Sequence, residues 1–310
     1  TLPLDVHFTM FIPTLRMQGT PEQRKTFLAD AEAFRLTGAY AQTELGHGSA
    51  LRNLETTCTF DKATDSFIVH TPRVSSMKAW PGGLGKAATH CVLLANLIVH
   101  GKNYGLHSFV VPLRDRTTFE PFEGVELGDL GPKFGYNTID NGYARFTNYR
   151  IPRKNMLMNY AELSADGTYR TKKGADLARK LTYGTMMRIR AGIVRGASRI
   201  LSRALTITIR YSCARLQGSV ARTGPEQVLL DYGAQQAILF PLLAKAFAFW
   251  ATGEQMHADY VDLLNAMQAG DFSALPEVHA ISSGLKSWVS VQTANGIELC
   301  RRACGGHGYT

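Results

Sequence analysis

The sequence predicts an α+β protein in which helices open and close the chain and short strands occupy its middle. Three observations carry this prediction. Apolar residues recur at helical spacing up to about residue 35, β-rich runs separated by Gly, Asp and Pro fill 38–151, and long helical periodicity takes over after residue 181. The composition suits a globular fold, because 45% of the 310 residues are apolar and 19% are charged.

Two helices are expected at the start of the chain. An apolar stripe at three- and four-residue steps marks the first, and it consists of Leu4, Phe8, Phe11 and Leu15. For the second, Thr20 can cap the helix, Pro21 occupies the first helical position, and Gln23 completes a capping box. We expect this second helix to end near Arg35.

The middle of the chain predicts an antiparallel sheet or barrel. The expected strands are 58–60, 66–70, 91–99, 108–112 and 142–148. The segment 61–65, Asp-Lys-Ala-Thr-Asp, is expected to form the hairpin turn between the first two of them.

Three long helices are expected in the last part of the chain, at 181–215, 225–264 and 276–304. Pro225 and Pro276 lie at or near the starts of the second and third, where a missing N–H costs little. Pro241 lies inside the second helix, so we expect it to kink that helix or divide it in two. The aromatic residues of 240–250 fall at helical spacing and are expected to pack in the core of a bundle.

Charge and cysteine content narrow the possible partners. The net charge of +9 fits either nucleic acid or an anionic, phosphate-bearing small molecule. No dense basic run with interleaved aromatics is present, which argues against nucleic acid. No apolar run approaches the roughly 20 residues of a membrane span. The five cysteines are odd in number and scattered, which argues against a disulfide framework, and Cys300 with Cys304 is interpreted as a buried pair rather than a metal site.

Three segments have compositions that local structure alone does not require: 41–49, Ala-Gln-Thr-Glu-Leu-Gly-His-Gly-Ser; 78–86, Lys-Ala-Trp-Pro-Gly-Gly-Leu-Gly-Lys; and 304–309, Cys-Gly-Gly-His-Gly-Tyr. The first is either a site for a bound ring or phosphate or simply a glycine-rich turn. The second is neither a Walker A nor a dinucleotide-binding motif. The third holds three glycines where a helix cap needs one, which indicates a close approach to the backbone.

Taken together and in this order, these segments resemble the acyl-CoA oxidase family, relatives of the acyl-CoA dehydrogenases. The other segments that carry the resemblance are 131–136, Gly-Pro-Lys-Phe-Gly-Tyr; 140–143, Asp-Asn-Gly-Tyr; 148–153, Asn-Tyr-Arg-Ile-Pro-Arg; and 181–186, Leu-Thr-Tyr-Gly-Thr-Met. The Trp-Pro-Gly-Gly-Leu-Gly-Lys sequence favours the oxidase branch. The resemblance implies an acyl-CoA dehydrogenase-like fold, with the end of an N-terminal helical domain (1–36), a middle β domain (37–163) and a helical domain (164–310).

The resemblance also implies that FAD is the cofactor and assigns roles to individual residues. Thr43 would hydrogen-bond the flavin ring, Gly82 would line it, and Ser49 would lie near the acyl-CoA chain. Arg215 would contact the FAD pyrophosphate of a neighbouring subunit, which implies a homodimer, and Gly305 and Gly306 would pass close to that cofactor. The Phe that the family has after Gln217 is absent, because Gly218 follows directly.

The activity implied by the resemblance is the FAD-dependent oxidation of fatty acyl-CoA to trans-2-enoyl-CoA, with O2 reduced to H2O2, in the peroxisome. An acyl-CoA dehydrogenase and a non-catalytic flavin- or acyl-CoA-binding fragment are the alternatives. The chain lacks an initiator Met, a signal peptide and a peroxisomal C-terminal tripeptide, so we expect both ends to be cut.

No residue of the chain is expected to act as the catalytic base. The family's glutamate is expected to lie beyond 304–309, and the alternative position in some dehydrogenases corresponds here to Met187 or Ile189, neither of which can take a proton. Glu44 and Asp140 are interpreted as loop and capping residues. His47 and His307 are expected to pack or to form hydrogen bonds.

Overall fold

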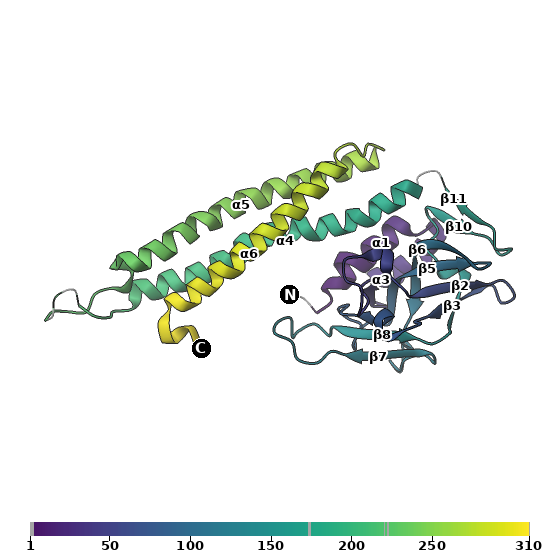
Figure 1. Ribbon diagram of the computed structural model, residues 1–310, viewed down its shortest axis with the longest axis horizontal. Coiled ribbons are helices and arrows are strands. Elements are labelled where there is room, and N and C mark those ends of the chain that lie inside the picture. Colours follow the sequence, from purple (N-terminus) through teal and green to yellow (C-terminus); the bar gives the residue numbers. More distant parts are fainter. Residues whose placement is uncertain (1–2, 173–174, 220, 222, 310) are drawn as a thin grey trace. The chain divides into compact units, whose positions relative to one another are not determined.

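The computed structural model describes residues 3–172, 175–219, 221 and 223–309, and the chain falls into two compact units, Thr1–Thr185 and Met186–Thr310 (Figure 1). Each unit is described by itself. For residues 175–186 and 268 only the backbone is described, so the side chains of the Leu-Thr-Tyr-Gly-Thr-Met segment at 181–186 lie outside the described residues. The proposed three-domain division remains a prediction.

The first unit begins with a run of short helices: η1 (His7–Phe11), α1 (Ile12–Gln18), α2 (Pro21–Gln23), η2 (Arg24–Leu28) and α3 (Ala29–Glu32). The capping box predicted at Thr20 and Gln23 is confirmed, with Pro21 at the start of the helix. Phe11 and Leu15 are buried as expected, but Phe8 is 44% exposed. The reason is that η1 is a π-helical turn, whose wider spacing rotates Phe8 off the apolar stripe.

His7 joins these helices to the sheet. Its side chain is buried, with Nε2 3.1 Å from the carbonyl of Ala31, while the backbone N–H of Gly38 donates to Nδ1 at 3.0 Å. Gly38 opens the first strand, and a Cβ there would overlap the Phe11 ring at 2.2 Å. The opening helices are therefore fixed to the edge of the sheet through one imidazole and one close backbone contact.

The main sheet has the strand order β1-β5-β2-β3-β9, with β6 on the other side of β5. Its strands are β1 (Gly38–Ala41), β2 (Thr57–Asp61), β3 (Ser66–His70), β5 (His90–Val99), β6 (Lys102–Pro112) and β9 (Tyr149–Pro152). The predicted strands and the hairpin turn at 61–65 are confirmed, although β6 begins six residues earlier than expected.

The expectation of a purely antiparallel sheet is wrong. β1 and β2 each run parallel to β5, pairing with its first and second halves respectively. Parallel pairing needs a crossover, and the chain supplies one between β3 and β5 through η4 (Val74–Ser76), β4 (Lys78–Ala79) and the glycine-rich loop that follows. The loop of the second singled-out segment is thus part of the crossover itself.

Two smaller sheets complete the first unit. One has the order β4-β8-β7, with β7 at Val125–Asp129 and β8 at Gly142–Phe146, and the other pairs β10 (Ala161–Leu163) with β11 (Tyr169–Thr171). Short 3-10 turns lie at η3 (Leu51–Asn53) and η5 (Arg153–Asn155). The buried core gathers on β2, β3, β5 and β6, where the Phe67 and Phe109 rings meet edge to face at 5.0 Å.

The helical unit consists of three long helices: α4 (Ala175–Ala214), which enters this unit at Met186, α5 (Gly233–Gln268) and α6 (Leu275–Ala303) (Figure 1). Two short helical turns, η6 (Leu229–Asp231) and η7 (Gly305–Tyr309), complete it. Small residues allow the helices to approach. A Cβ on Gly253 of α5 would lie 2.7 Å from the Arg195 Cα of α4, and one on Gly296 of α6 would lie 2.8 Å from Leu201. The ion pair of Arg195 with Glu254, at 2.8 Å, adds a polar link between α4 and α5.

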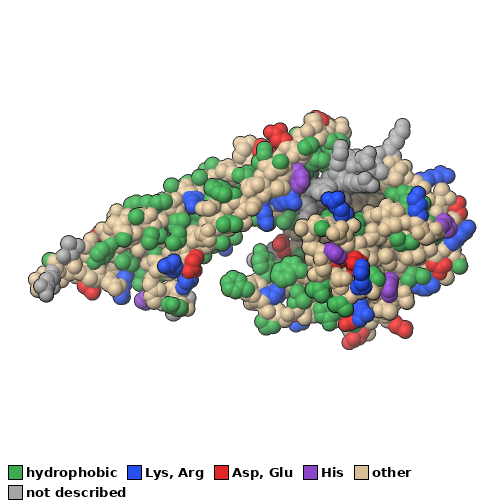
Figure 2. Space-filling view, in the orientation of Figure 1, with side chains coloured by type: hydrophobic (Ala, Val, Ile, Leu, Met, Phe, Trp, Pro, Cys, Tyr) green, Lys and Arg blue, Asp and Glu red, His purple; other side chains and the backbone are tan. Residues whose placement is uncertain are grey.

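Three expectations for this unit need correction. α5 begins at Gly233, so Pro225 precedes the helix, and α5 continues through Pro241 without division. Of the aromatic residues at 240–250, Phe249 is buried, but Phe240, Phe247 and Trp250 are 49%, 66% and 58% exposed. They form a second apolar stripe at helical spacing, beside the buried face of α5, and hydrophobic side chains gather along this helix in Figure 2.

The expectation that no segment is apolar enough to cross a membrane also needs correction, at α5. Within the described residues, Gly233–Met267 contains an 18-residue window with a mean hydropathy of 1.2, although only 28% of that window is buried. Core helices of soluble proteins meet the same criterion, so length and composition alone do not identify α5 as a membrane-spanning helix.

Candidate functional site

The first two singled-out segments, 41–49 and 78–86, lie side by side in the first unit. Residues 43–46 run alongside 75–79, and three backbone hydrogen bonds join them: Ala79 N–H to Thr43 O at 3.0 Å, Leu45 N–H to Met77 O at 2.8 Å and Gly46 N–H to Ser75 O at 2.8 Å. The residue predicted to bind the flavin ring, Thr43, is thereby held next to the strand that leads into the glycine-rich loop.

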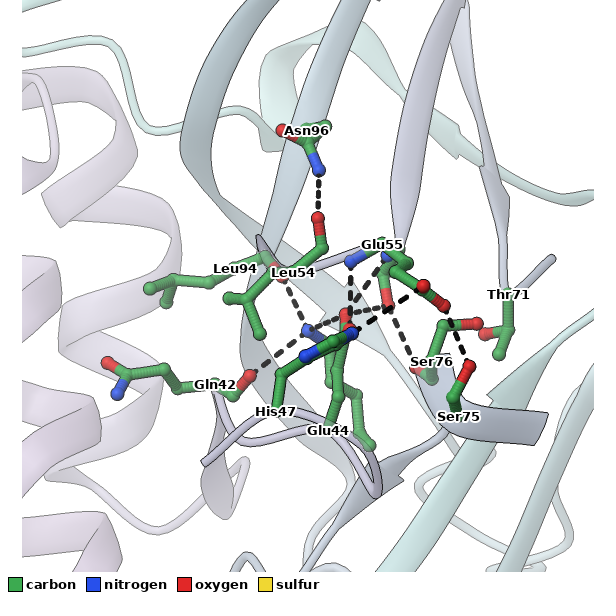
Figure 3. A network of polar contacts seen from close by, with 12 residues as sticks. Gln42, Glu44, His47, Leu54, Glu55, Thr71, Ser75, Ser76, Leu94 and Asn96 are labelled. Carbon is green, nitrogen blue, oxygen red and sulfur yellow. Dashed lines mark hydrogen bonds and ion pairs between the residues drawn. The ribbon is translucent and has the colours of Figure 1, made fainter. Parts of the chain in front are cut away.

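A buried carboxylate ties these segments together (Figure 3). Glu44 has no exposed side-chain surface and accepts four hydrogen bonds. Its Oε1 atom accepts from Lys78 Nζ at 3.0 Å, from the Thr56 N–H at 3.0 Å and from the Thr56 hydroxyl at 2.7 Å, while Oε2 accepts from the Glu55 N–H at 2.8 Å. Glu44 is therefore a structural carboxylate in a loop, as expected, but its central role in a buried network was not predicted.

Lys78 is the cation of this pair and is equally buried. Besides Glu44, its ammonium donates to the carbonyls of Gln42 at 3.1 Å and Leu94 at 2.8 Å, so each of its three N–H groups has a partner. Burial lowers the pKa of Lys78, and the neighbouring Glu44 carboxylate opposes that shift. One lysine thus connects the Thr43 loop, the strand before the glycine-rich loop and the central strand β5.

An outer layer of charges surrounds this pair around Glu55. His47 Nε2 lies 3.5 Å from the Glu55 carboxylate, and Arg73 pairs with the same carboxylate at 2.5 Å. The Ser75 hydroxyl donates to Glu55 at 2.9 Å, and this hydrogen bond is the largest cause of the lowered pKa of Glu55. His47 accordingly packs beside Glu55, in line with the expected packing role, although its Nε2 makes no hydrogen bond within the described part of the chain.

The glycine-rich loop that follows Trp80 is held by charged side chains from two directions. The Arg114 guanidinium, only 6% exposed, donates to the carbonyls of Leu84 at 3.3 Å, Gly85 at 2.8 Å and Ala88 at 3.0 Å. From the other side, Asp140 Oδ2 accepts from the backbone N–H groups of Lys86 at 2.8 Å and Ala87 at 2.7 Å. The capping role expected for Asp140 is confirmed.

The polar atoms beside the loops fit a ligand with hydrogen-bonding ring atoms. Thr43 is half-buried, and its hydroxyl has no hydrogen-bond partner among the residues that the structure describes. Gln42 Oε1 and Asn141 Oδ1 are buried acceptors that likewise lack a donor among the described residues. Buried acceptors are normally paired, so each of these two atoms is consistent with a bound group that supplies its partner. Ser49 is exposed, without a side-chain hydrogen bond among the described residues.

Gly82 has a packing reason for its identity within this unit. A Cβ there would lie 2.9 Å from Ile139 Cγ2 and 3.0 Å from Val6 Cγ2, so the position excludes larger residues before any ligand is considered. Its role beside the flavin ring therefore remains a prediction.

The remaining predicted residues lie together at one end of the helical unit. Tyr211, near the end of α4, has its hydroxyl 3.1 Å from His307 Nδ1, and Gln235 of α5 donates to the carbonyl of Ala303 at 3.0 Å. These contacts bring 304–309 to the end of α4, where Arg215 is exposed. For two of the three glycines, the local structure explains why the residue is glycine. Gly305 has a φ of 59°, and a Cβ on Gly308 would lie 2.2 Å from Arg301 O. Gly306 faces open space.

The positions that match the alternative base carry apolar side chains that hold no titratable proton, with Met187 fully buried and Ile189 half-buried. Cys300 and Cys304 are buried, as predicted, and their Thr208 neighbour donates to the Cys300 carbonyl at 3.1 Å. Among the described residues, no group of three or more His, Cys, Asp or Glu side chains is arranged to hold a metal ion.

Comparison with known proteins identifies the family. Residues 1–37 match the family model "Acyl-coenzyme A oxidase N-terminal", and residues 183–310 match "Acyl-CoA oxidase, C-alpha1 domain". The chain belongs to the acyl-CoA oxidase family. The chain is 50% identical over 308 residues to peroxisomal acyl-coenzyme A oxidase 1 of Homo sapiens, and 47% identical over 309 residues to that of Arabidopsis thaliana. Each alignment covers 99% of this chain and 46% of the relative, so the chain spans less than half the length of these curated relatives.

Solved structures agree with this family. Arabidopsis thaliana acyl-CoA oxidase 1 has a TM-score of 0.94 at 46% identity, covering 100% of this chain and 47% of that one. Acyl-CoA oxidase-1 of Caenorhabditis elegans, complexed with FAD and ATP, has a TM-score of 0.92 at 44% identity, covering 99% of this chain and 45% of that one. The α+β fold class, with opening helices, a middle β-sheet region and a closing helical bundle, is confirmed.

Sequence reasoning missed the side chains that support the loops. Glu44 with Lys78 and Arg114 with its three carbonyls were not predicted, although one signal was available. Lys78 directly precedes Ala79 and Trp80, and Arg114 directly follows Leu113, which comes after the apolar run at 109–112. Charged residues in such apolar surroundings need partners when buried, which would have directed attention to both.

Proposed function

We propose that this chain forms part of an FAD-dependent acyl-CoA oxidase that converts fatty acyl-CoA to trans-2-enoyl-CoA and reduces O2 to H2O2. The observation that carries the proposal is the 47–50% identity to peroxisomal acyl-coenzyme A oxidases, which extends over 99% of the chain. The solved Caenorhabditis elegans relatives, described as bound with FAD and, in one case, an ascaroside-CoA, support the cofactor and the CoA thioester class. The peroxisomal relatives support a peroxisomal location.

Within this proposal, residues of the first unit orient a flavin ring, and residues of the helical unit contact the phosphates of a cofactor bound by a neighbouring subunit. The Thr43 hydroxyl, which has no partner among the described residues, would donate to or accept from the flavin, and Gly82 would line it. Arg215 would pair with a pyrophosphate, because a planar guanidinium matches two phosphate oxygens. Gly306, open on its Cβ side, would allow close backbone approach together with Gly305, and Ser49 would contact the acyl-CoA.

When bound, FAD supplies the ring that accepts hydride and returns electrons to O2. The side chains of this chain would bind and orient the cofactor and the substrate. No side chain at the family's alternative base position can accept a proton. Met187 has a thioether and Ile189 a hydrocarbon side chain, Glu44 accepts from four donors, and Asp140 accepts from the loop backbone. The α-proton of the thioester would therefore leave to a group outside these positions.

We also propose a homodimer assembled through the helical unit. The exposed stripe of Phe240, Leu243, Phe247 and Trp250 along α5 supports this assembly, because obligate interfaces are large and apolar. Arg215 would then serve the cofactor of the second subunit.

The test compares the full-length protein with the 310-residue chain. Given FAD and a saturated fatty acyl-CoA, the full-length protein should release one H2O2 per enoyl-CoA in air, with the flavin bleaching under anaerobic conditions. A flavin that bleaches but stays reduced in air would identify a dehydrogenase. A protein that binds both ligands without bleaching would identify a binding module. The 310-residue chain should turn over about 10²–10⁴-fold more slowly, as expected without a general base.

A further inference from the structure

Trp80 has an unusual backbone conformation. Its φ is 87°, a value that residues other than glycine rarely adopt. It also directly precedes Pro81, and a proline restricts the residue before it to extended conformations. Its indole is also 56% exposed. A bulky residue in such a conformation stores strain, and the surrounding structure must hold it there.

Two consecutive residues hold it. The side-chain amide of Asn141 donates to the Trp80 carbonyl at 2.7 Å, and the Trp80 N–H donates to the Gly142 carbonyl at 2.9 Å. The Gly142 N–H in turn donates to the Pro81 carbonyl at 3.1 Å. The strained peptide is thereby bonded on both of its polar groups to the start of β8.

The residue before Asn141 continues the same support along the loop. The Asp140 carbonyl accepts from Gly85 N–H at 3.1 Å, and its carboxylate accepts the two further N–H groups described above. Gly142 is required for this approach, because a Cβ there would lie 2.3 Å from the Gly85 nitrogen. Six hydrogen bonds from 140–142 therefore shape the segment 80–87.

Asn141 is the side chain in this support whose hydrogen-bonding groups are only partly used. It is 6% exposed, and its Oδ1 is buried without a donor among the described residues. The amide orientation is set by the Trp80 carbonyl, which needs a donor. Neither an aspartate nor a leucine of similar size would supply that donor.

We propose that Asn141 is a positioning residue that clamps Trp80 in its left-handed conformation, so that the loop 80–86 is preformed for the flavin ring. The inference rests on the proposed function, since it assigns the loop to the flavin. Asn141 acts through the shape of the loop, and its effect on cofactor binding depends on the strain at Trp80.

That dependence gives a double-variant test. N141A should raise the dissociation constant of FAD about tenfold, because without the clamp the strain at Trp80 is released and the loop loses its preformed shape. In a W80G background the strain is gone, because glycine adopts positive φ freely, so adding N141A should change the constant by less than about twofold. N103A, which alters an exposed asparagine on β6, serves as the matched control and should bind FAD as the unaltered chain does.

Limited trypsin cleavage after the exposed Lys86, measured on the chain without FAD, provides a readout that needs no cofactor. N141A should accelerate this cleavage, and N141A should add nothing in the W80G background. If neither the unaltered chain nor any variant binds FAD, the proposed function fails. The cleavage assay still tests whether Asn141 holds Trp80 in its conformation. Equal effects of N141A in both backgrounds, or none in either, would overturn the clamp. If N141A alone does not fold, recovery of folding by W80G/N141A supports it, and failure of both overturns it.

Discussion

Replacing Glu44 by Gln tests whether the buried ion pair with Lys78 holds the first unit together. The substitution keeps the shape and one acceptor oxygen but removes the charge, and it turns an amide N–H₂ group toward the Glu55 N–H, which now donates to Oε2. Both side chains of the pair are fully buried. Removing one partner of such a pair typically costs about 3–5 kcal/mol, because the other charge stays buried without compensation.

The expected shift is large enough to measure by thermal unfolding. For a unit of this size, Thr1–Thr185, each 1 kcal/mol shifts the melting temperature by about 2–4 °C, so E44Q should melt roughly 6–20 °C lower. The deficit should shrink as the pH rises toward 10.5, the ordinary pKa of lysine. Burial already lowers the pKa of Lys78, and without Glu44 the neutral amine becomes the favoured folded form, which costs less to reach at high pH.

The double variant separates the pair from its individual side chains. E44Q/K78M removes both charges and should be more stable than the sum of the two single losses predicts, because replacing a whole buried pair is often near neutral. E126Q, which alters the exposed Glu126–Arg145 pair at 3.9 Å, is the control and should leave the melting temperature unchanged. An unchanged melting temperature for E44Q, or strict additivity in the double variant, would refute the reasoning.

Three further predictions follow from the same structure. Thr43→Val should raise the FAD dissociation constant by about 2–12-fold or shift the flavin absorbance, through loss of a hydrogen bond of about 0.5–1.5 kcal/mol; an unchanged constant and spectrum would count against Thr43 as a flavin ligand. Burial lowers the pKa of His90 to about 4, with Arg116 contributing, so its stability contribution is present above pH 6.5 and is lost as the pH falls. Urea unfolding should show about 2 kcal/mol lost from this residue between pH 7 and 5, and H90Q should lose less; an equal loss would contradict the assignment. Light scattering should find FAD-loaded protein as a dimer, and R215A should release FAD faster; a flavin-loaded monomer would exclude a shared site.

Local rules predicted local features well. The capping box at Thr20 and Gln23, the hairpin turn at 61–65 and the buried pair at the end of α6 each depend on residues close together in the chain, and each is confirmed. The direction of pairing was not predictable in the same way. Whether β1 joins β5 in parallel depends on a crossover of about fifty residues, which no local periodicity records.

The candidate site shows the same limit. The sequence located the segments 41–49 and 78–86 but not the contacts between them, because Glu44 and Lys78 are separated by 34 positions. The exposed stripe on α5 was misjudged for a related reason. Helical spacing predicts an apolar face but does not say whether a partner covers it, and Phe249 and Phe247 differ only in which side of the helix they occupy.

The placement of buried charge argues that the two loops matter beyond stability. Among the residues that the structure describes, the fully charged side chains that are buried are Glu44, Lys78 and Arg114. All three bond to the backbone or side chains of the loop segments: Lys78 to the Gln42 carbonyl and to Glu44, and Arg114 to three carbonyls of 84–88. Burying a charge is costly, and well-packed apolar residues are often as stable or more so. A fold that concentrates this cost at two adjacent loops fixes their geometry at the expense of stability, which is the pattern expected where the backbone must meet a ligand.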